Sequence, residues 1–327
     1  FGLRRAQGHS AGLWGARAAM IGGFNGTSNM EAGKRFGIPV LGTMAHSWVM
    51  SFDEEIDAFR EYVRQYHDNL ILLADTYNVL EMGVPHAIQV FKELKEEGRL
   101  PGKYGIRIDS GDIAYLSQEA TRMFTEAGFP DAIISGSNDL DEYTIQSLKA
   151  QGCTVTSWGV GTKIITADGT SALGGVFKMA VKEADGKEVP VMKFSNDVEK
   201  MTNPGIKTVY RFYKKDTGKM ITDLVCLHDE KAADGGDFTL VTESAKWRRK
   251  ELKAGTYTVE ELLRPVVENG RNLPLPALPE IIRYADKQMD TLWPEYTRLL
   301  NPDLMEINLS DKLQTLKSEL IRRELGE

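Results

Sequence analysis

Short apolar runs alternate with amphipathic segments over the first half of the chain, and this alternation limits the folds that the chain can adopt. The segment after the second run, for example, places Ile88, Phe91 and Leu94 at helical spacing. Apolar strands separated by helices are typical of parallel strands that are buried on both faces. We predict strands at residues 38–42, 70–74, 104–108, 132–134, 153–157 and 173–178, and helices at 52–66, 85–98, 117–128 and 140–152.

A series of about five or six such strand–helix units favours a closed barrel over an open sheet. We therefore predict an α/β fold with an irregular TIM-like α/β barrel over residues 1–182, incomplete at its amino terminus. An open, doubly wound sheet is the alternative. From residue 183 the pattern changes to hairpins, with Gly218 in the turn between strands at 209–213 and 220–227. Residues 183–327 are predicted to form a second, smaller α+β domain that ends in helices at about 279–299 and 309–325.

Composition excludes several classes of protein. The chain has 327 residues and a formal net charge of −7, so no broad basic surface for nucleic acid is expected. No apolar run reaches the roughly 18 residues that a membrane-spanning helix needs, and no signal peptide is visible. Its two cysteines, Cys153 and Cys226, have neither zinc-ligand spacing nor the pattern of a disulfide framework. We expect a cytoplasmic protein with no nucleic-acid or membrane partner.

The first candidate site residue is His46, which follows the predicted strand at 38–42. Gly42 and Thr43 open the backbone after the strand, and an acidic helix start follows at residues 51–55. A strand, a turn of small residues, a histidine and a helix are the layout of a site at the carboxyl edge of a parallel sheet. The alternative is a loop histidine satisfied by ordinary hydrogen bonds.

Charged residues lie in and after the strand at 104–108. Arg107 and Asp109 are two residues apart, so their side chains point the same way, and a charged pair inside a barrel is costly without a partner or a function. Asp109 and Asp112 bracket a tight turn, where carboxylates suit ribose hydroxyls or a hydrated Mg²⁺. The alternative is a structural ion pair. Asp75 follows the strand at 70–74 and is either a site residue or a helix cap.

Two glycine-containing turns follow the next two predicted strands. The first holds Gly136 and Ser137, and the second holds Gly159, Gly161 and Thr162. Free backbone N–H groups at adjacent strand ends are typical of the phosphate site of such barrels, although loop glycines are common in any protein. A basic loop at residues 193–197 and 200–207 is a second candidate for a polyphosphate, or an ordinary solvated loop.

Taken together, these motifs resemble the nicotinate phosphoribosyltransferase family and, more broadly, the type II phosphoribosyltransferases. The resemblance covers residues 1 to about 210 and is specific as a set, whereas the last third of the chain is less diagnostic. The matching motifs are FGLRR at 1–5, NGTSN at 25–29, GTMAHS at 42–47, DTYN at 75–78, IRIDSGD at 106–112, SGSND at 135–139 and WGVGT at 158–162.

The resemblance implies a reaction. Members of this family join nicotinate to 5-phosphoribosyl 1-pyrophosphate, which gives nicotinate mononucleotide and pyrophosphate in NAD salvage. They couple this step to ATP hydrolysis through a transient phosphohistidine, and by resemblance His46 is that histidine. A neutral imidazole near pH 7 is a workable nucleophile towards a phosphoryl group. The resemblance also implies Mg²⁺ as cofactor and ATP as co-substrate, but the sequence does not identify metal ligands.

The same resemblance assigns the substrate pocket. Phe1 resembles the aromatic residue that stacks on the pyridine ring, and Arg4 the arginine that meets the pocket. Ser28 stands where related nicotinamide enzymes carry an Asp. An Asp there would repel the nicotinate carboxylate by about 1–4 kcal/mol at about 4 Å, so Ser28 favours the acid over the amide.

The resemblance also assigns the ribose and phosphate contacts. Arg107 and Asp109 resemble residues that border the ring and the ribose, and Asp75 resembles an acid near the ribose and the metal. The 5′-phosphate cradle corresponds to Gly136, Ser137, Gly159, Gly161 and Thr162.

The family resemblance further implies a homodimer with a site shared between subunits. The chain begins at Phe1 without a Met, and we expect that its natural amino-terminal part is lacking. Two alternatives stay open: a phosphoribosyltransferase that uses nicotinamide or quinolinate, and a non-catalytic phosphosugar-binding barrel.

Overall fold

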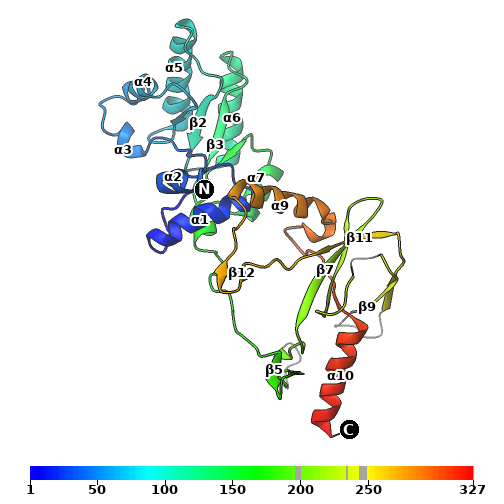
Figure 1. Cartoon of the computed structure of the whole chain (residues 1–327). Coiled ribbons are helices and arrows are strands. Elements are labelled where there is room, and N and C mark those ends of the chain that lie inside the picture. Colours follow the sequence, from blue (N-terminus) through cyan, green and yellow to red (C-terminus); the bar gives the residue numbers. More distant parts are fainter. Residues whose placement is uncertain (196–199, 233–234, 243–248, 327) are drawn as a thin grey trace. The chain divides into compact units, whose positions relative to one another are not determined.

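The computed structural model describes residues 1–195, 200–232, 235–242 and 249–326. The chain divides into two compact units, Phe1–Leu173 and Gly174–Glu327, and each is described by itself (Figure 1). The division of function between residues 1–182 and 183–327 stays a prediction.

A parallel sheet organises the first unit. Its strands are β1 (Leu70–Leu73), β2 (Tyr104–Ile108), β3 (Ile133–Gly136) and β4 (Ser157–Trp158), and they lie in sequence order β1-β2-β3-β4. All three strand pairs are parallel, which confirms the predicted α/β class. The helices between the strands are α5 (Val84–Glu96), α6 (Ile113–Glu126) and α7 (Glu142–Ala150), and Figure 1 shows α6 alongside β2 and β3.

The residues before β1 are mainly helical. Asn29 caps α2 by accepting from the backbone N–H of Ala32, and Gly37 ends that helix in the left-handed conformation. The helices of this segment are α1 (His9–Ile21), α2 (Met30–Phe36), α3 (His46–Val49) and α4 (Glu55–Gln65); after β1 and β4 come the π-helical turn η1 (Val79–Gly83) and α8 (Thr162–Ile165).

Two predicted strands are wrong. The segment at 38–42 makes a single bridge between Thr27 and Val40, because Pro39 has no N–H to donate to a ladder. The segment at 173–178 is not a strand, and its Phe177 side chain is fully exposed. Gly174 and Gly175 weaken strand formation there. The strand at 153–157 begins later than predicted, at Ser157.

The core of the first unit explains why its strand ends are held firmly. All four residues of β1 are buried, as are Ile106 and Ile108 of β2. Phe91 packs at 5.0 Å from Tyr104, at 6.0 Å from Phe124 and at 6.1 Å from Phe129, measured between ring centroids. Each buried phenylalanine contributes about 1.5–3 kcal/mol, so the helices α5 and α6 are fixed to the sheet.

The second unit is α+β, as predicted. Its main sheet has the order β10-β9-β14-β8-β7-β11 and packs around Tyr210, Phe212, Leu224 and Leu240. The predicted hairpin is confirmed as β7 and β8, with Gly218 at φ +68° in the turn. The strands of this unit are β5 (Val181–Ala184), β6 (Lys187–Pro190), β7 (Lys207–Lys214), β8 (Met220–Leu227), β9 (Phe238–Thr242), β10 (Arg249–Leu252), β11 (Tyr257–Glu261), β12 (Val267–Glu268), β13 (Arg271–Asn272) and β14 (Ile307–Leu309).

Two helices and a 3₁₀ turn complete the second unit. They are α9 (Leu278–Thr291), η3 (Pro294–Tyr296) and α10 (Asp311–Leu325). The helix α9 is shorter than the predicted 279–299, because Pro294 disfavours a helical conformation at Trp293. The helix α10 starts at the cap Ser310 and ends at Gly326, close to the predicted bounds. No helix in the described ranges has the length and apolar character needed to cross a membrane.

Candidate functional site

The carboxyl ends of β1 to β4 lie at one edge of the sheet because the strands are parallel. The hydrogen-bond ladder continues past the strands: Ala74 N donates to Arg107 O at 3.0 Å, Ser137 N to Ile108 O at 3.0 Å and Gly159 N to Gly136 O at 2.8 Å. The residues that directly follow the strands are therefore held in register with one another. We call the side chains that meet at this edge the edge cluster. It consists of Asp75, Thr76, Asp109 and Ser137 after the strands, Arg107 in β2 and His46 in α3.

His46 is the first residue of α3 and faces both aspartates. Its Nδ1 lies 3.0 Å from Thr76 Oγ1, within hydrogen-bond distance. Its Nε2 lies 3.8 Å from Asp75 Oδ1 and 3.8 Å from Asp109 Oδ2, which is close for charge attraction but too long for a hydrogen bond. The side chain is 41% exposed, so a ligand can reach it.

Asp75 is buried and half satisfied. Its Oδ2 accepts from Asp109 N at 3.0 Å and from Ser110 Oγ at 2.6 Å. Its Oδ1, near His46, has no hydrogen-bond partner within the part of the chain that the structure describes. The alternative that Asp75 caps a helix is wrong, because Asn78 caps η1. A buried carboxylate oxygen left without a donor points to a function.

Arg107 connects three elements of the site. Its Nη2 pairs with Asp109 Oδ1 at 2.9 Å, its Nε donates to Ser137 Oγ at 2.8 Å, and its Nη1 donates to Thr43 Oγ1 at 2.9 Å. Ser137 Oγ in turn donates to Asp109 Oδ1. Each of the three guanidinium nitrogens of Arg107 thus has a partner that fixes its orientation. The bond to Thr43 also holds the loop before α3 against the sheet edge.

Asp109 is ionised at neutral pH. Burial by itself raises the pKa of this carboxyl. The hydrogen bonds from Ser137 and Arg107 outweigh that effect, with help from the charges of Arg107 and His46, and hold the pKa below its ordinary value. The edge cluster therefore presents fixed negative charge beside the histidine.

The glycine turns pack against the same edge. A Cβ on Gly159 would lie 3.1 Å from Ser137 Cβ, and a Cβ on Gly161 would lie 3.2 Å from Gly2 O. These glycines allow close approach of the two turns and of the first residues of the chain, since Gly2 N donates to Val160 O at 2.9 Å. Gly136 ends β3, and Thr162 is the first residue of the four-residue helix α8.

Phe1 and Ser28 lie next to each other. Ser28 N donates to Phe1 O at 3.0 Å, and the Phe1 ring meets Phe24 edge-on at 6.0 Å between centroids. Ser28 is exposed, and Phe1 is half-buried. Since Gly2 is bonded to the turn after β4, the structure brings Phe1 and Ser28 to the same region as Gly161.

Some predicted residues lie outside the edge cluster. Arg4 is exposed, and its side chain makes no hydrogen bond to any residue that the structure describes. Asp112 caps α6 by accepting from Tyr115 N at 3.0 Å, so it has a structural role. In the basic loop, Lys207 donates to the carbonyls of Asn203 and Gly205; Asn196 and Asp197 of that prediction lie outside the described residues.

The sequence reasoning did not identify three hydroxyl residues as part of the site. Thr43, Thr76 and Ser110 each bond to a member of the edge cluster. Thr76 and Ser110 directly follow predicted site residues, and Thr43 shares a matching motif with His46, so their places in the motifs were the available signal.

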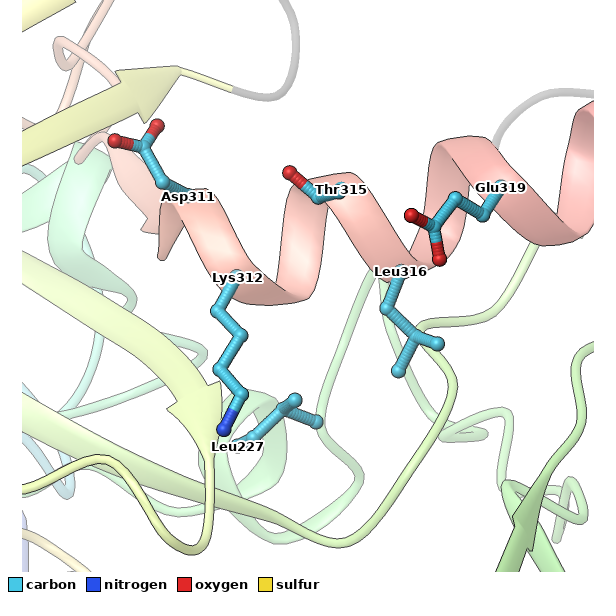
Figure 2. Close-up of a pocket in the computed structure, with 6 residues that line it drawn as sticks. All are labelled: Leu227, Asp311, Lys312, Thr315, Leu316 and Glu319. Carbon is cyan, nitrogen blue, oxygen red and sulfur yellow. The ribbon is translucent and has the colours of Figure 1, made fainter.

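A groove in the second unit is of a different kind. It runs along α10 beside the end of β8, and Figure 2 shows its six lining side chains. Leu227 and Leu316 supply apolar surface, while Lys312 is already paired with Asp229. The groove has no histidine, cysteine or unpaired buried acid among its lining residues. It therefore lacks the features of a reactive site.

The fold and the edge cluster define a class: an α/β protein with a site built from a histidine, two aspartates and glycine turns at the carboxyl edge of a parallel sheet. The model of the nicotinate phosphoribosyltransferase (NAPRTase) family matches residues 1–232, and that of the nicotinate phosphoribosyltransferase C-terminal domain matches residues 206–317. The chain belongs to the nicotinate phosphoribosyltransferase family.

Individual curated relatives support this family assignment. Nicotinate phosphoribosyltransferase of Bacillus subtilis (strain 168) is 41% identical over 325 residues, covering 98% of this chain and 64% of the relative. The enzyme of that name from Caenorhabditis elegans is 32% identical over 370 residues, covering 96% and 64%. The chain thus spans 64% of the length of each of these curated relatives.

Solved structures share the fold. Human nicotinic acid phosphoribosyltransferase matches with a TM-score of 0.80 at 29% identity, covering 98% of this chain and 69% of that chain. Nicotinate-nucleotide pyrophosphorylase from Pyrococcus furiosus matches with a TM-score of 0.61 at 19% identity, covering 89% and 65%, which is a likeness of fold alone.

Proposed function

We propose that this chain carries the nicotinate phosphoribosyltransferase reaction. Nicotinate and 5-phosphoribosyl 1-pyrophosphate give nicotinate mononucleotide and pyrophosphate, coupled to hydrolysis of ATP to ADP and phosphate. The observation that carries the proposal is His46, accessible and set 3.8 Å from two aspartates, in a member of this family.

The hydrogen bonds of His46 support a particular nucleophilic atom. Both carboxylates near Nε2 are acceptors, so they favour a proton on Nε2 and leave the lone pair on Nδ1, where the Thr76 hydroxyl donates. In the proposed step the Thr76 hydroxyl releases Nδ1, and a bond forms between Nδ1 and the γ-phosphorus of ATP. The bond to the β,γ-bridging oxygen breaks, and ADP leaves with that electron pair. The carboxylates stabilise the positive charge on the ring.

In the glycosyl transfer, Asp75 and Asp109 would have a different role. The bond between C1 of the ribose and pyrophosphate breaks, positive charge develops on the ribose, and the nicotinate ring nitrogen forms the new bond. Ionised Asp109 and buried Asp75 would stabilise such charge. Arg107, held by three partners, would border the ring and the ribose.

Substrate groups are assigned from the chemistry of the side chains around the edge cluster. Phe1 would stack on the pyridine ring, Arg4 would meet the carboxylate, and Ser28 would donate to that carboxylate. In the turns that follow Gly136 and Gly159, the backbone N–H groups of Ser137 and Gly159 already donate within the sheet, so the 5′-phosphate would accept from the other N–H groups of these turns. Ser137, Gly161 and Thr162 complete that cradle.

Mg²⁺ is the cofactor that fits these residues. Within the described ranges no three histidine, cysteine or acidic residues form a cage for a metal ion. Mg²⁺ usually takes one or two carboxylates together with substrate phosphates. Asp75, with its free Oδ1, and Asp109 would hold it. When bound, Mg²⁺ would neutralise charge on the departing pyrophosphate.

We further propose a homodimer in the cytosol. The run from Leu173 to Met179 exposes Leu173, Val176, Phe177 and Met179, and such an apolar run supports contact with a second copy of the chain. The negative net charge supports neither nucleic acid nor anionic membrane as a partner.

Labelling with γ-³²P-ATP tests the proposal. The protein should acquire acid-labile, base-stable phosphate, and adding nicotinate and 5-phosphoribosyl 1-pyrophosphate should yield nicotinate mononucleotide. A folded protein that binds the phosphosugar but forms neither product would be a binding barrel instead.

A further inference from the structure

Two segments of the first unit carry the two halves of the edge cluster. The first segment runs from His46 through α3 into α4, and it is tied together by Trp48 Nε1, which donates to Ala58 O at 3.0 Å. The second runs from Asp75 through η1 into α5. In it, the Asn78 side chain accepts from Leu80 N and Glu81 N at 3.1 and 3.0 Å. Each segment is therefore well braced internally.

The second segment is also locked to the end of β1. A Cβ on Gly83 would lie 2.0 Å from Ala74 O, so no larger residue fits at this contact. Gly83 closes the π-helical turn that leads directly into α5. Turns of this kind are frequent at functional sites. A shift of the first turn of α5 would therefore also move Asp75 and Thr76.

One buried pair joins the two segments near the site. Glu55, in the first turn of α4, has a fully buried side chain, and its Oε2 lies 2.7 Å from His86 Nδ1 in the first turn of α5. Glu55 Oε1 has no hydrogen-bond partner among the residues that the structure describes. Burial raises the pKa of Glu55, His86 offsets this in part, and the Asp75 carboxylate raises it further. Glu55 therefore lies within electrostatic range of the edge cluster.

Stability alone does not explain this pair. Apolar residues of similar volume often stabilise a fold as well as a buried ion pair does. The presence of this pair is therefore weak evidence that it stabilises the folded protein. Such a pair is better suited to fixing one arrangement of two segments than to adding stability.

We propose that Glu55 and His86 form a positioning pair. They hold the segment that carries His46 against the segment that carries Asp75 and Thr76, so that His46 Nδ1 stays within hydrogen-bond distance of Thr76 Oγ1. The kinetic consequence rests on the proposed function, whereas the structural consequence does not.

The test compares two Glu→Gln changes on neighbouring helices. E55Q removes the negative charge from the buried pair, and E93Q removes it from the exposed pair in which Arg60 Nη2 lies 2.7 Å from Glu93 Oε1, farther along α4 and α5. The readout is the imidazole ¹⁵N resonances of His46 in the full chain, which has five histidines. T76V supplies the resonance expected when the Nδ1 hydrogen bond is lost.

E55Q should move the His46 Nδ1 resonance towards the T76V value, E93Q should leave it unchanged, and E55Q combined with T76V should add nothing to T76V. If E55Q alters the His86 resonances but leaves His46 as in the unaltered protein, the proposal is overturned. Should E55Q fail to fold, H86L breaks the pair from its more exposed side, while H86Q keeps a donor and should restore the His46 resonance.

A kinetic arm separates this proposal from the proposed function. E55Q should slow phosphorylation of His46 by ATP about tenfold to a hundredfold, as misplacement of a reacting group does, while E93Q keeps the original rate. An unaltered protein that is never phosphorylated would refute the proposed function and leave the resonance test to decide on the positioning pair. Equal rates in E55Q and E93Q, with phosphorylation intact, would refute the kinetic role of the pair.

Discussion

Each of the two units contains an arginine–aspartate pair, and the two pairs differ in how completely their atoms are hydrogen-bonded. In the second unit, Arg211 bonds both oxygens of Asp223 at 2.8 Å, and Gln288 accepts from the same guanidinium at 2.8 Å. In the first unit, Arg107 and Asp109 are each 26% exposed and share Ser137. Beside them, Asp75 keeps one buried oxygen without a partner in the described structure.

The difference separates two uses of the same chemistry. A pair whose atoms all bond within the protein has nothing left to offer a ligand, so Arg211 and Asp223 serve the fold. A cluster that keeps an accessible imidazole beside an unsatisfied carboxylate retains capacity for a substrate. Changes in the second unit should therefore affect stability, and changes in the edge cluster should affect chemistry.

The largest expected effect is that of H46Q. Removing the proposed nucleophile should abolish acid-labile phosphate, because the Nδ1 atom that faces Thr76 Oγ1 is lost. Labelling with γ-³²P-ATP measures this. The melting temperature should hardly change, because the side chain is 41% exposed. Retained labelling in H46Q would place the phosphate elsewhere.

The next effect is on stability. D223A should destabilise the second unit by about 1–3 kcal/mol, because it leaves the half-buried Arg211 guanidinium without its carboxylate. Urea unfolding measures this. D75N should cost far less, since one oxygen of Asp75 has no donor among the residues that the structure describes. If D75N were as destabilising as D223A, the contrast between the edge cluster and the Arg211–Asp223 pair would be lost.

Substrate choice should change by a moderate factor. S28D should shift the ratio of kcat/KM for nicotinate to that for nicotinamide towards the amide, by about tenfold or more, since repulsion of the carboxylate is about 1–4 kcal/mol. Steady-state kinetics with both substrates measures the ratio. S28A is the control, and it should weaken nicotinate use without favouring nicotinamide. An unchanged ratio in S28D would count against this pocket assignment.

The smallest effect is a pH dependence. The folded-state pKa of Asp109 is lowered, so the unfolded chain binds this proton more tightly than the folded chain does. The stability from this group is fully present above the ordinary aspartate pKa of about 3.9 and is lost as the pH falls through the lowered folded value. S137A should raise the pKa of Asp109, and ¹³C NMR of the carboxyl follows it. A pKa unchanged in S137A would mean that the Ser137 hydrogen bond contributes little.

The strand ends could be predicted because the runs before Asp75, Asp109 and Gly136 are apolar and end abruptly. The two wrong strand predictions have local causes. Pro39 prevents a ladder at 38–42, and Gly174 and Gly175 prevent a strand at 173–178. Sequence could not tell that Asp112 caps a helix while Asp75 does not, because both residues precede helical segments.

The pairing of Glu55 with His86 could not be predicted from the sequence, for a different reason. Glu55 and His86 are 31 residues apart, and neither belongs to a motif. Their pairing depends on the packing of α4 against α5, which no local pattern encodes. Thr76, in contrast, directly follows Asp75 and could have been proposed from its position.

The position of the phosphate on the imidazole of His46 tests the central claim most directly. The protein is labelled with ¹⁵N-histidine, phosphorylated with ATP and studied by ³¹P–¹⁵N NMR. We predict that the phosphorus will be bonded to Nδ1, with the proton on Nε2 facing Asp75 and Asp109. Phosphorus bonded to Nε2, between the two carboxylates, would contradict the roles given to these aspartates.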